Sequence, residues 1–304
     1  MYRNPVVSIV IPTRNRPEVV SRAVRSALAQ TLVDIEVVVV IDGIDQATAK
    51  SLAAITDHRL ITVCLPVSVG GAEARNIGIR RGNGKWIALL DDDDEWSPHK
   101  LARQVDLART SRKRFPVVTC RLIARRPTGD ELWPARRIRS NESMSEYLLC
   151  RDASIRQGEG FIQTSTLLMP RELMLQIPFE PGLPRHQDWD WLIRASVCAD
   201  VEFLWVWDPL VTYRISGPER SVSTGRSLEA SVDWVNRNRL VTPKARAYFY
   251  ATQVAARCNT PATFWSVVRN TMRYPRALAI ALGFTLTPRN LVDRSRPRSI
   301  FTHA

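Results

Sequence analysis

The sequence predicts an α/β protein with a mainly parallel sheet flanked by helices and a helical C-terminal extension. Three observations support this fold class. The first hundred residues alternate short, fully apolar runs with segments of helical periodicity, residues 115–215 mix strands and helices, and the residues after about 228 show helical patterns only. Fully apolar runs are typical of strands that helices cover on both faces, as in parallel sheets.

The first hundred residues are expected to hold four strands, at 6–11, 35–41, 60–65 and 86–90. Helices are expected between them, at 17–28, 46–55 and 71–81. Pro17 suits the first position of a helix, and the apolar residues that follow it fall on one face. Ser97 and Pro98 have the pattern of a cap and first residue, so we expect a fourth helix to begin there.

The pattern changes after residue 115. We expect strands at 117–124, 161–169, 201–206 and 210–215, with helices at 143–150 and 188–198. From Leu228 onward only helices are expected, separated by Pro243, Pro261, Pro275 and Pro288. The predicted organisation is therefore a main domain over 1–225, with halves at 1–108 and 109–225, and a helical extension over 226–304.

Composition limits the class of protein. With 304 residues and 45% hydrophobic content the chain can bury a full core. The start, MYRNP, leads directly into a strand-like run and lacks the apolar core of a signal peptide, so we expect a cytoplasmic protein. Five widely spaced cysteines without a C-x-x-C pair are expected to be reduced and to bind no zinc.

The net charge of +13 is unevenly distributed along the chain. Residues 1–108 carry 13 basic and 13 acidic residues, and 109–139 carry 10 basic and 2 acidic. Residues 140–236 carry 8 basic and 14 acidic, whereas 237–304 carry 12 basic and 1 acidic. The basic excess at the C-terminal end indicates a surface that meets an anionic partner.

Polar segments follow each of the first four predicted strands, at 12–16, 42–43, 66–71 and 91–94. Ligands of open parallel sheets bind outside the carboxyl ends of the strands. Four consecutive aspartates repel one another unless a cation neutralises them, and Mg²⁺ or Mn²⁺ is the simplest candidate. A solvated acidic turn that caps the next helix is the alternative, and the run alone does not decide between them.

Four segments together resemble the family 2 glycosyltransferases of GT-A fold: 7–16, 36–43, 71–78 and 86–96. They occur in the family's order and cover the first 105 residues. The resemblance implies a Rossmann-like GT-A domain and an inverting transferase that takes its sugar from a nucleoside diphosphate. The donor is expected to be a UDP- or dTDP-sugar, bound by residues 1–108, and the acceptor is expected to bind residues 109–225.

The resemblance also implies roles for individual residues. It places the nucleotide base and ribose against Pro12, Thr13 and Arg14, with Asp42 accepting a hydrogen bond from the base. Arg75 is expected near the phosphates. Asp42 as a turn cap and Arg75 in a surface ion pair are the alternatives.

The acidic run divides into roles in the same way. The resemblance implies that Asp91 contacts the nucleotide-sugar and that Asp93 ligates the metal. Asp92 and Asp94 remain unassigned.

The segment 186–194, HQDWDWLIR, resembles the family's second signature, in which an acidic residue opens a helix beneath the acceptor. Gln187 stands where the family usually has Glu. Asp188 matches the key carboxylate and is the candidate base that removes the acceptor proton. Asp190 is the second candidate, although it points to another side of the helix. The alternative for the whole segment 186–194 is a helix N-terminus that carries carboxylates without a catalytic role. Residues 161–166 are expected to line the sugar pocket.

Two other classes of protein compete with this interpretation. In phosphotransferases and phosphatases with an Asp nucleophile, a D-x-D motif also follows an apolar strand. That strand is usually the first, whereas here the motif follows the fourth. A non-enzymatic nucleic-acid-binding protein would explain the pI of about 10.2, but the charge lies away from the acidic run. We therefore expect no nucleic acid partner.

The C-terminal region supports a separate hypothesis. Residues 275–286 are apolar, too short to span a bilayer, and flanked by arginines. They could lie on an anionic membrane and bring the enzyme to a lipid-linked acceptor, or form a buried helix with a basic rim.

Overall fold

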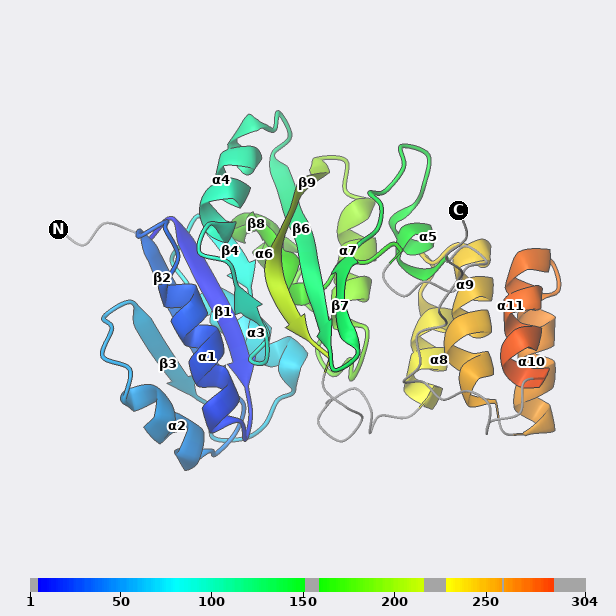
Figure 1. Cartoon of the computed structure of the whole chain (residues 1–304), viewed down its shortest axis with the longest axis horizontal. Coiled ribbons are helices and arrows are strands. Elements are labelled where there is room, and N and C mark those ends of the chain that lie inside the picture. The colour runs from blue at the N-terminus through cyan, green and yellow to red at the C-terminus, as the bar shows by residue number, and fades with distance from the viewer. Residues whose placement is uncertain (1–4, 151–158, 216–227, 259, 287–304) are drawn as a thin grey trace, which may run out of the picture.

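The structure of the chain is a computed structural model that describes residues 5–150, 159–215, 228–258 and 260–286. In these residues nine strands form one sheet in the order β3-β2-β1-β4-β8-β6-β9-β5, with β7 paired to β6 (Figure 1). The strands are β1 Val7–Thr13, β2 Ile35–Ile41, β3 Leu60–Cys64, β4 Trp86–Leu89, β5 Glu95–Trp96, β6 Phe115–Arg126, β7 Gly129–Trp133, β8 Leu168–Pro170 and β9 Val201–Arg214.

The first four long strands pair in parallel and form the half of the sheet predicted for residues 1–108. Helix α1 (Pro17–Leu28) covers one face, where alternate residues of β1 and β2 are fully buried. Helix α3 (Gly71–Arg81) covers the other face. Gly78 permits its close approach, because a Cβ added there would lie 2.4 Å from Val10 Cγ1. Two covered faces explain why these runs are apolar throughout.

The second half of the sheet is mixed. Strand β8 runs antiparallel to both β4 and β6, whereas β9 pairs in parallel with β6. Irregular pairing near Arg121 lets the two predicted strands at 201–206 and 210–215 form one long strand, β9. Helices in this half include α4 Lys100–Thr110, α5 Met144–Leu149, α6 Arg171–Gln176 and α7 Gln187–Ser196.

Most predicted elements are confirmed, and helices α1 and α3 have the predicted bounds; α2 (Gln46–Ala53) ends two residues early. The predicted start of the fourth helix is wrong. Ser97 does not cap it; its carbonyl accepts a turn hydrogen bond from Lys100 N, and α4 begins only at Lys100. The strand predicted at 161–169 is also wrong over most of its length, because residues 164–166 form a short 3₁₀ turn before β8.

The C-terminal region is helical, as predicted, in the part that the structure describes. It contains α8 Leu228–Arg237, α9 Pro243–Phe249, α10 Pro261–Thr271 and α11 Pro275–Leu286, with a π turn at Tyr250–Val254 and a 3₁₀ turn at Ala255–Arg257. Pro243, Pro261 and Pro275 each begin a helix, where their missing N–H costs nothing. Pro288 and the predicted boundary at 225 lie outside the described residues.

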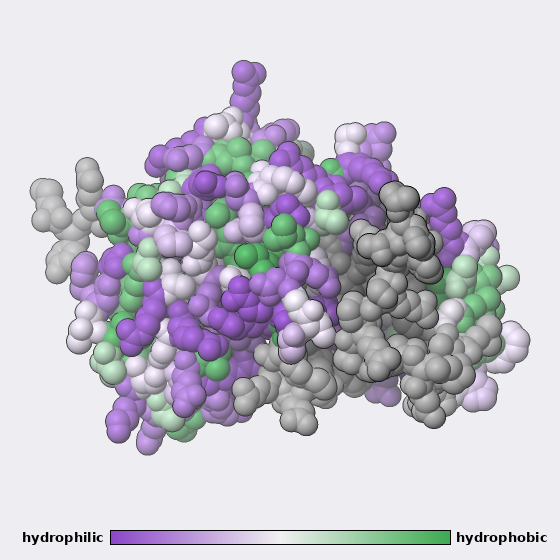
Figure 2. Space-filling model, viewed as in Figure 1, coloured by the Kyte–Doolittle hydropathy of each residue, from purple (hydrophilic) through white to green (hydrophobic). Residues whose placement is uncertain are grey.

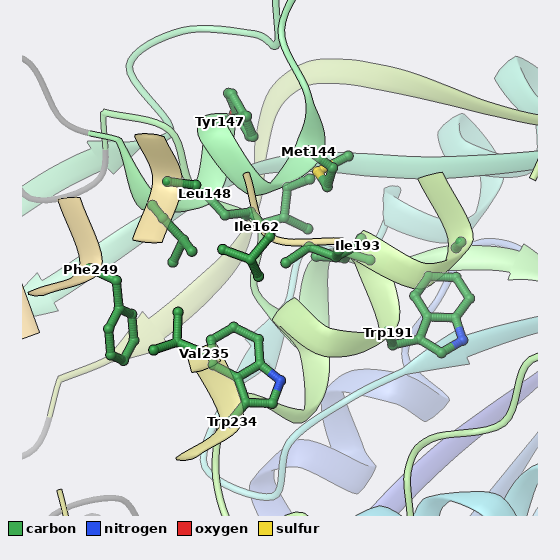
Figure 3. Packing of buried hydrophobic residues seen from close by; sticks show 14 of the residues in the cluster. Met144, Tyr147, Leu148, Ile162, Trp191, Ile193, Trp234, Val235 and Phe249 are labelled. Atoms are coloured by element: carbon green, nitrogen blue, oxygen red, sulfur yellow. The ribbon is translucent and has the colours of Figure 1, made fainter. Parts of the chain in front are cut away.

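These helices share a core with the sheet. Trp234 and Val235 of α8 and Phe249 of α9 belong to the same buried cluster as Trp191 and the other apolar residues of α7 (Figure 3). The helices group at one end of the molecule, on the right in Figure 1. No helix within the described ranges has the length and apolar character needed to cross a membrane.

Candidate active site

A pocket of about 590 Å³ opens at the carboxyl ends of β1, β2 and β4. All eight residues singled out from the sequence line it: Pro12, Thr13, Arg14, Asp42, Arg75, Asp91, Asp93 and Asp188. The parallel strands explain this convergence, since the segment after each strand emerges at the same edge of the sheet. The chain thus brings residues from four distant segments to one cavity.

Asp42 anchors a loop at one side of the pocket. Its carboxylate is almost fully buried and accepts hydrogen bonds from the Val69 and Gly70 amides and the Ser68 hydroxyl, at 2.6, 3.1 and 2.9 Å. Arg14 Nη1 donates to the same Ser68 Oγ at 2.8 Å. Asp42 therefore fixes the loop before α3. Its Oδ2 accepts two of these bonds and its Oδ1 only one, so Oδ1 still offers a lone pair to a further donor.

Arg75 connects the acidic run to the helix of the second signature. One guanidinium nitrogen donates to Asp91 Oδ1 at 2.5 Å and the other to Gln187 Oε1 at 2.7 Å. Gln163 Nε2 donates to the second oxygen of Asp91 at 2.9 Å. Arg75 therefore lies inside the pocket in a part-buried ion pair, rather than in a surface pair.

Arg16 neutralises the middle of the acidic run. Its Nη1 lies 2.8 Å from Asp92 Oδ1 and 3.1 Å from Asp93 Oδ2, and the Thr13 hydroxyl donates to Asp92 Oδ2 at 2.7 Å. Burial raises the pKa of Asp92 to about 6, against the lowering effect of Arg16, and burial also raises the pKa of Asp93. The sequence predicts repulsion among the four aspartates. In the structure, the positive charge of Arg16 and the raised pKa values of Asp92 and Asp93 reduce that repulsion.

Asp94 is the structural member of the run. It is 1% exposed, and its Oδ2 accepts from the Ser165 hydroxyl at 2.5 Å and from Gln163 Nε2 at 2.8 Å. Burial raises its pKa well above the usual range, which favours a protonated carboxyl. Asp94 therefore ties the run to the 3₁₀ turn at 164–166 and does not line the pocket.

The acidic run fits a divalent cation only in part. Asp93 has the most exposed carboxylate of the run, at 34% against 25% for Asp91 and 9% for Asp92. Among the described residues, no group of three His, Cys, Asp or Glu side chains could hold a metal alone. Mg²⁺ and Mn²⁺ sites often combine one or two carboxylates with phosphate oxygens and water, and Asp93 suits such a site.

Asp188 faces the pocket from the first turn of α7. Its Oδ1 accepts the Trp189 amide at 2.9 Å, an arrangement that the positive end of the helix dipole favours. Burial, and next the negative charge of Asp91, raise the pKa of Asp188 to about 6. A carboxylate with a pKa near 6 is suited to accept a proton at neutral pH.

Asp190 is held away from the pocket. Its carboxylate accepts from Arg194 Nε at 2.7 Å, Trp234 Nε1 at 3.0 Å and Asn238 Nδ2 at 3.3 Å. These bonds link α7 to α8 and occupy both oxygens. The geometry therefore favours Asp188 over Asp190 as the base.

His186 makes a second link between α7 and the C-terminal helices. Its ring stacks between those of Trp189 and Trp234, with centroids 4.8 Å away on each side, and its Nε2 lies 3.0 Å from Ser231 Oγ. Burial lowers the pKa of His186 to about 3, so the ring is neutral. The residue has a positive φ of 61°, which turns the chain into the helix that carries Asp188.

Aromatic side chains form one wall of the pocket. Phe161 and Tyr213 line the cavity, and Trp133 packs behind both at centroid distances of 5.2 and 6.4 Å. Phe161 lies in the segment expected to line a sugar pocket. Rings of this kind offer the apolar faces on which a sugar can stack.

Three pocket residues were not assigned roles from the sequence. Arg16 is the last residue of the segment 7–16 that resembles the family, but only the fold shows that it reaches Asp92 and Asp93. Gln163 lies in the segment 161–166 that was expected to line a sugar pocket, but it had no role of its own there. Tyr213 comes from a segment without a family motif, so no local signal identified it. The convergence of four segments at one edge could be predicted. The positions of Gln163 and Tyr213 could not, because they depend on the mixed half of the sheet.

The family model of glycosyl transferase family 2 matches residues 8–173, more than half of the chain. The chain belongs to this family. It is therefore a glycosyltransferase with the GT-A fold, which excludes the phosphotransferase and non-enzymatic alternatives. The match extends beyond the first 105 residues and includes β6, β7 and β8 of the second half of the sheet, but not β9.

Curated relatives of this glycosyltransferase include AmsB, an amylovoran biosynthesis glycosyltransferase of Erwinia amylovora. AmsB is 28% identical over 254 residues, which cover 80% of this chain and 81% of AmsB. The Escherichia coli β-1,3-glucosyltransferase WfaP, named for UDP-Glc and α-D-GlcNAc-diphosphoundecaprenol, is 33% identical over 36% of this chain and 44% of its own length. The chain thus spans most of AmsB but under half of WfaP.

Solved structures support the fold. TarS 1–349 of S. aureus in complex with UDP-GlcNAc has a TM-score of 0.64 at 14% identity, covering 92% of this chain and 89% of TarS 1–349. The mannosyltransferase PcManGT of Pyrobaculum calidifontis, in complex with GDP-Man and Mn²⁺, has a TM-score of 0.54 at 18% identity, covering 92% and 75%. At these identities the likeness concerns the fold.

Proposed function

We propose that this glycosyltransferase transfers a sugar from a nucleoside-diphosphate sugar to a hydroxyl group of a glycan or lipid-linked glycan, with inversion at the anomeric carbon. The main observation is the pocket itself. Its lining combines Asp42, Arg75 and Asp91, which we propose bind the donor, with the half-buried carboxylate of Asp188. The relatives named above support a donor of this class, since TarS binds UDP-GlcNAc and PcManGT binds GDP-Man.

The donor would lie across the carboxyl ends of β1, β2 and β4. Base and ribose would contact Pro12, Thr13 and Arg14, and Asp42 would accept a hydrogen bond from the base while holding the 68–70 loop. Arg75 would pair with the diphosphate, in place of part of its pairing with Asp91. A uridine or thymidine base suits the acceptor oxygen of Asp42, because each has an N–H on its pairing edge.

Asp188 would act as the general base. It would remove the proton from the acceptor hydroxyl while that oxygen forms a bond to the anomeric carbon. The bond from that carbon to the diphosphate oxygen breaks on the opposite face, and the electron pair leaves with the diphosphate. A single displacement of this kind inverts the anomeric configuration.

Asp93 would hold Mg²⁺ or Mn²⁺ together with donor phosphate oxygens. A bound divalent cation would neutralise the charge that develops on the leaving diphosphate. Arg16 now pairs with Asp92 and Asp93, so it balances the acidic run before the donor arrives. Once the donor is bound, the Arg16 guanidinium would also pair with a donor phosphate.

The acceptor would stack on the wall formed by Phe161 and Tyr213. The names of AmsB and WfaP associate these relatives with polysaccharide biosynthesis and with a diphosphoundecaprenol-linked sugar. We therefore assign this enzyme to cell-envelope polysaccharide biosynthesis in the cytoplasm, at the inner face of the membrane where a lipid-linked acceptor would be presented.

A panel of donors tests the proposal. Purified enzyme is mixed with UDP-, dTDP- and GDP-sugars, each with Mn²⁺, Mg²⁺ or a chelator, and thermal stability and sugar hydrolysis are measured. At least one donor should stabilise the protein and be hydrolysed, more strongly with metal than with chelator. Absence of any response to every donor would refute the proposal.

A further inference from the structure

The outer edge of α10 and α11 combines exposed apolar and basic side chains. Trp265 and Met272 are 66% and 62% exposed, which is unusual for large apolar residues. Arg269, Arg273 and Arg276 are also exposed. We call these five residues the α10–α11 edge. Figure 2 shows apolar side chains gathered on this part of the molecule, next to α10 and α11 in Figure 1.

Helical spacing places the apolar residues of this edge together. Trp265, Arg269 and Met272 are four and seven positions apart, so they lie along one face of α10 and its last turn. The opposite face carries Val267 and Thr271, which are 1% and 0% exposed and pack into the core. The inner face therefore stabilises the fold, whereas Trp265 and Met272 on the outer face stay mostly exposed, although Trp265 contacts the neighbouring ring of Phe264.

The C-terminal segment that carries this edge is basic. Residues 237–286 contain eight arginine and lysine residues and no aspartate or glutamate. A second copy of the chain would meet the same positive charge and be repelled. An anionic partner would be attracted, and it must also accommodate an exposed tryptophan and methionine.

We infer that the α10–α11 edge binds the surface of an anionic membrane. Tryptophan is suited to the boundary between headgroups and acyl chains, and arginines beside it attract acidic headgroups. Nucleic acid would satisfy the arginines but would leave Met272 unexplained. α11 is too short to span a bilayer, so the helices would lie on the surface. The purpose of this contact, access to a lipid-linked acceptor, rests on the proposed function.

Vesicle flotation of the full chain without donor tests the inference. Vesicles of phosphatidylcholine alone are compared with vesicles of phosphatidylcholine and phosphatidylglycerol in equal parts. The protein should float with the anionic vesicles only, and high salt should release it. Arg269→Gln with Arg273→Gln should weaken binding roughly 30-fold, and Trp265→Ala with Met272→Ala should also weaken it. Arg112→Gln with Arg239→Gln removes two exposed charges elsewhere and should change binding far less.

Two results would overturn the inference: a full chain that ignores anionic vesicles, or edge variants that bind them as the unmodified chain does. Loss of retention on nucleic acid in the edge variants, without loss of vesicle binding, would identify a different partner and overturn it equally. Donor hydrolysis by the edge variants should be unchanged. If the unmodified enzyme bound vesicles but hydrolysed no donor, the proposed function would be refuted, whereas the inference that the α10–α11 edge binds membranes would stand.

Discussion

Two aspartates that are two positions apart on α7 illustrate how environment assigns a role to a side chain. Asp188 faces the pocket and has one hydrogen bond to a backbone amide, whereas Asp190 is occupied by Arg194, Trp234 and Asn238. The sequence alone could rank them only by helical position. Arg194 follows Asp190 by four positions on α7 itself, but Trp234 and Asn238 come from α8 and the loop after it, which no local pattern could have predicted.

Asp188→Asn should lower transfer by about 10²–10⁴-fold while leaving donor binding within error, because the amide cannot accept the acceptor proton. In the unmodified enzyme kcat/KM should rise with pH through a pKa near 6, as Asp188 loses its proton. Steady-state kinetics over pH 5–8 and donor titrations measure both effects. Full transfer by the Asn variant would require another base.

The same substitution should change stability in the opposite direction. Burial raises the pKa of Asp188 from 3.8 to about 6, so the fold is favoured by the protonated form and loses that contribution as pH rises through 6. Asp188→Asn should therefore raise the melting temperature at pH 8 and have little effect at pH 4. Equal effects at both pH values would contradict the assigned pKa.

Asp93→Ala should weaken metal-dependent donor binding by at least about 10–100-fold, because the donor phosphates would lose their shared cation. Binding measured in the presence of a chelator should change much less. Isothermal titration of the donor with and without Mn²⁺ distinguishes metal-dependent donor binding from metal-independent donor binding. An equal loss under both conditions would mean that Asp93 contacts the donor directly and does not ligate a metal.

At the scale of elements, the parallel half of the sheet was predictable because its runs are apolar on both faces. The 161–169 segment was not, because its polar side chains bond to the local backbone. Gln163 Oε1 accepts from Ser165 N, and Thr166 Oγ1 donates to Gln163 O. Such bonds favour a turn over a strand. The edge strands β5 and β7 were missed because they lack an apolar run.

Gly78→Ala should lower the free energy of unfolding by about 1–3 kcal/mol, because the new methyl group would clash with Val10 and push α3 from the sheet. Gly283→Ala in α11 is the matched control, since no atom lies within 4 Å of the added Cβ. It should be neutral or stabilise the helix. Urea unfolding measures both. Equal responses would show that α3 adapts without strain.

At the scale of the whole molecule, the C-terminal helices and the catalytic helix form one packed unit. Trp234 contributes its indole face to His186 and its N–H to Asp190, and it belongs to the core cluster that includes α7 (Figure 3). The sequence predicted a helical extension but not this joint. Its members are separated by more than forty residues, and each is unremarkable alone.

Trp234→Ala should lower the free energy of unfolding by about 3–5 kcal/mol and reduce kcat, because the first turn of α7 would lose its support. Trp234→Phe keeps a ring against His186 and should lose only about 1 kcal/mol. The exposed Trp265→Ala is the control and should alter stability by less than about 0.5 kcal/mol. A Trp234→Ala enzyme with normal kcat would show that α8 does not position Asp188.

Gln187 is expected to affect the pH at which Asp188 can accept a proton. It meets Arg75 with a neutral amide, where the family usually has a carboxylate, so one negative charge is missing beside Asp188. Gln187→Glu would restore that charge and make the neighbouring proton harder to lose. The acidic limb of the kcat/KM profile should then move to higher pH than in the unmodified enzyme.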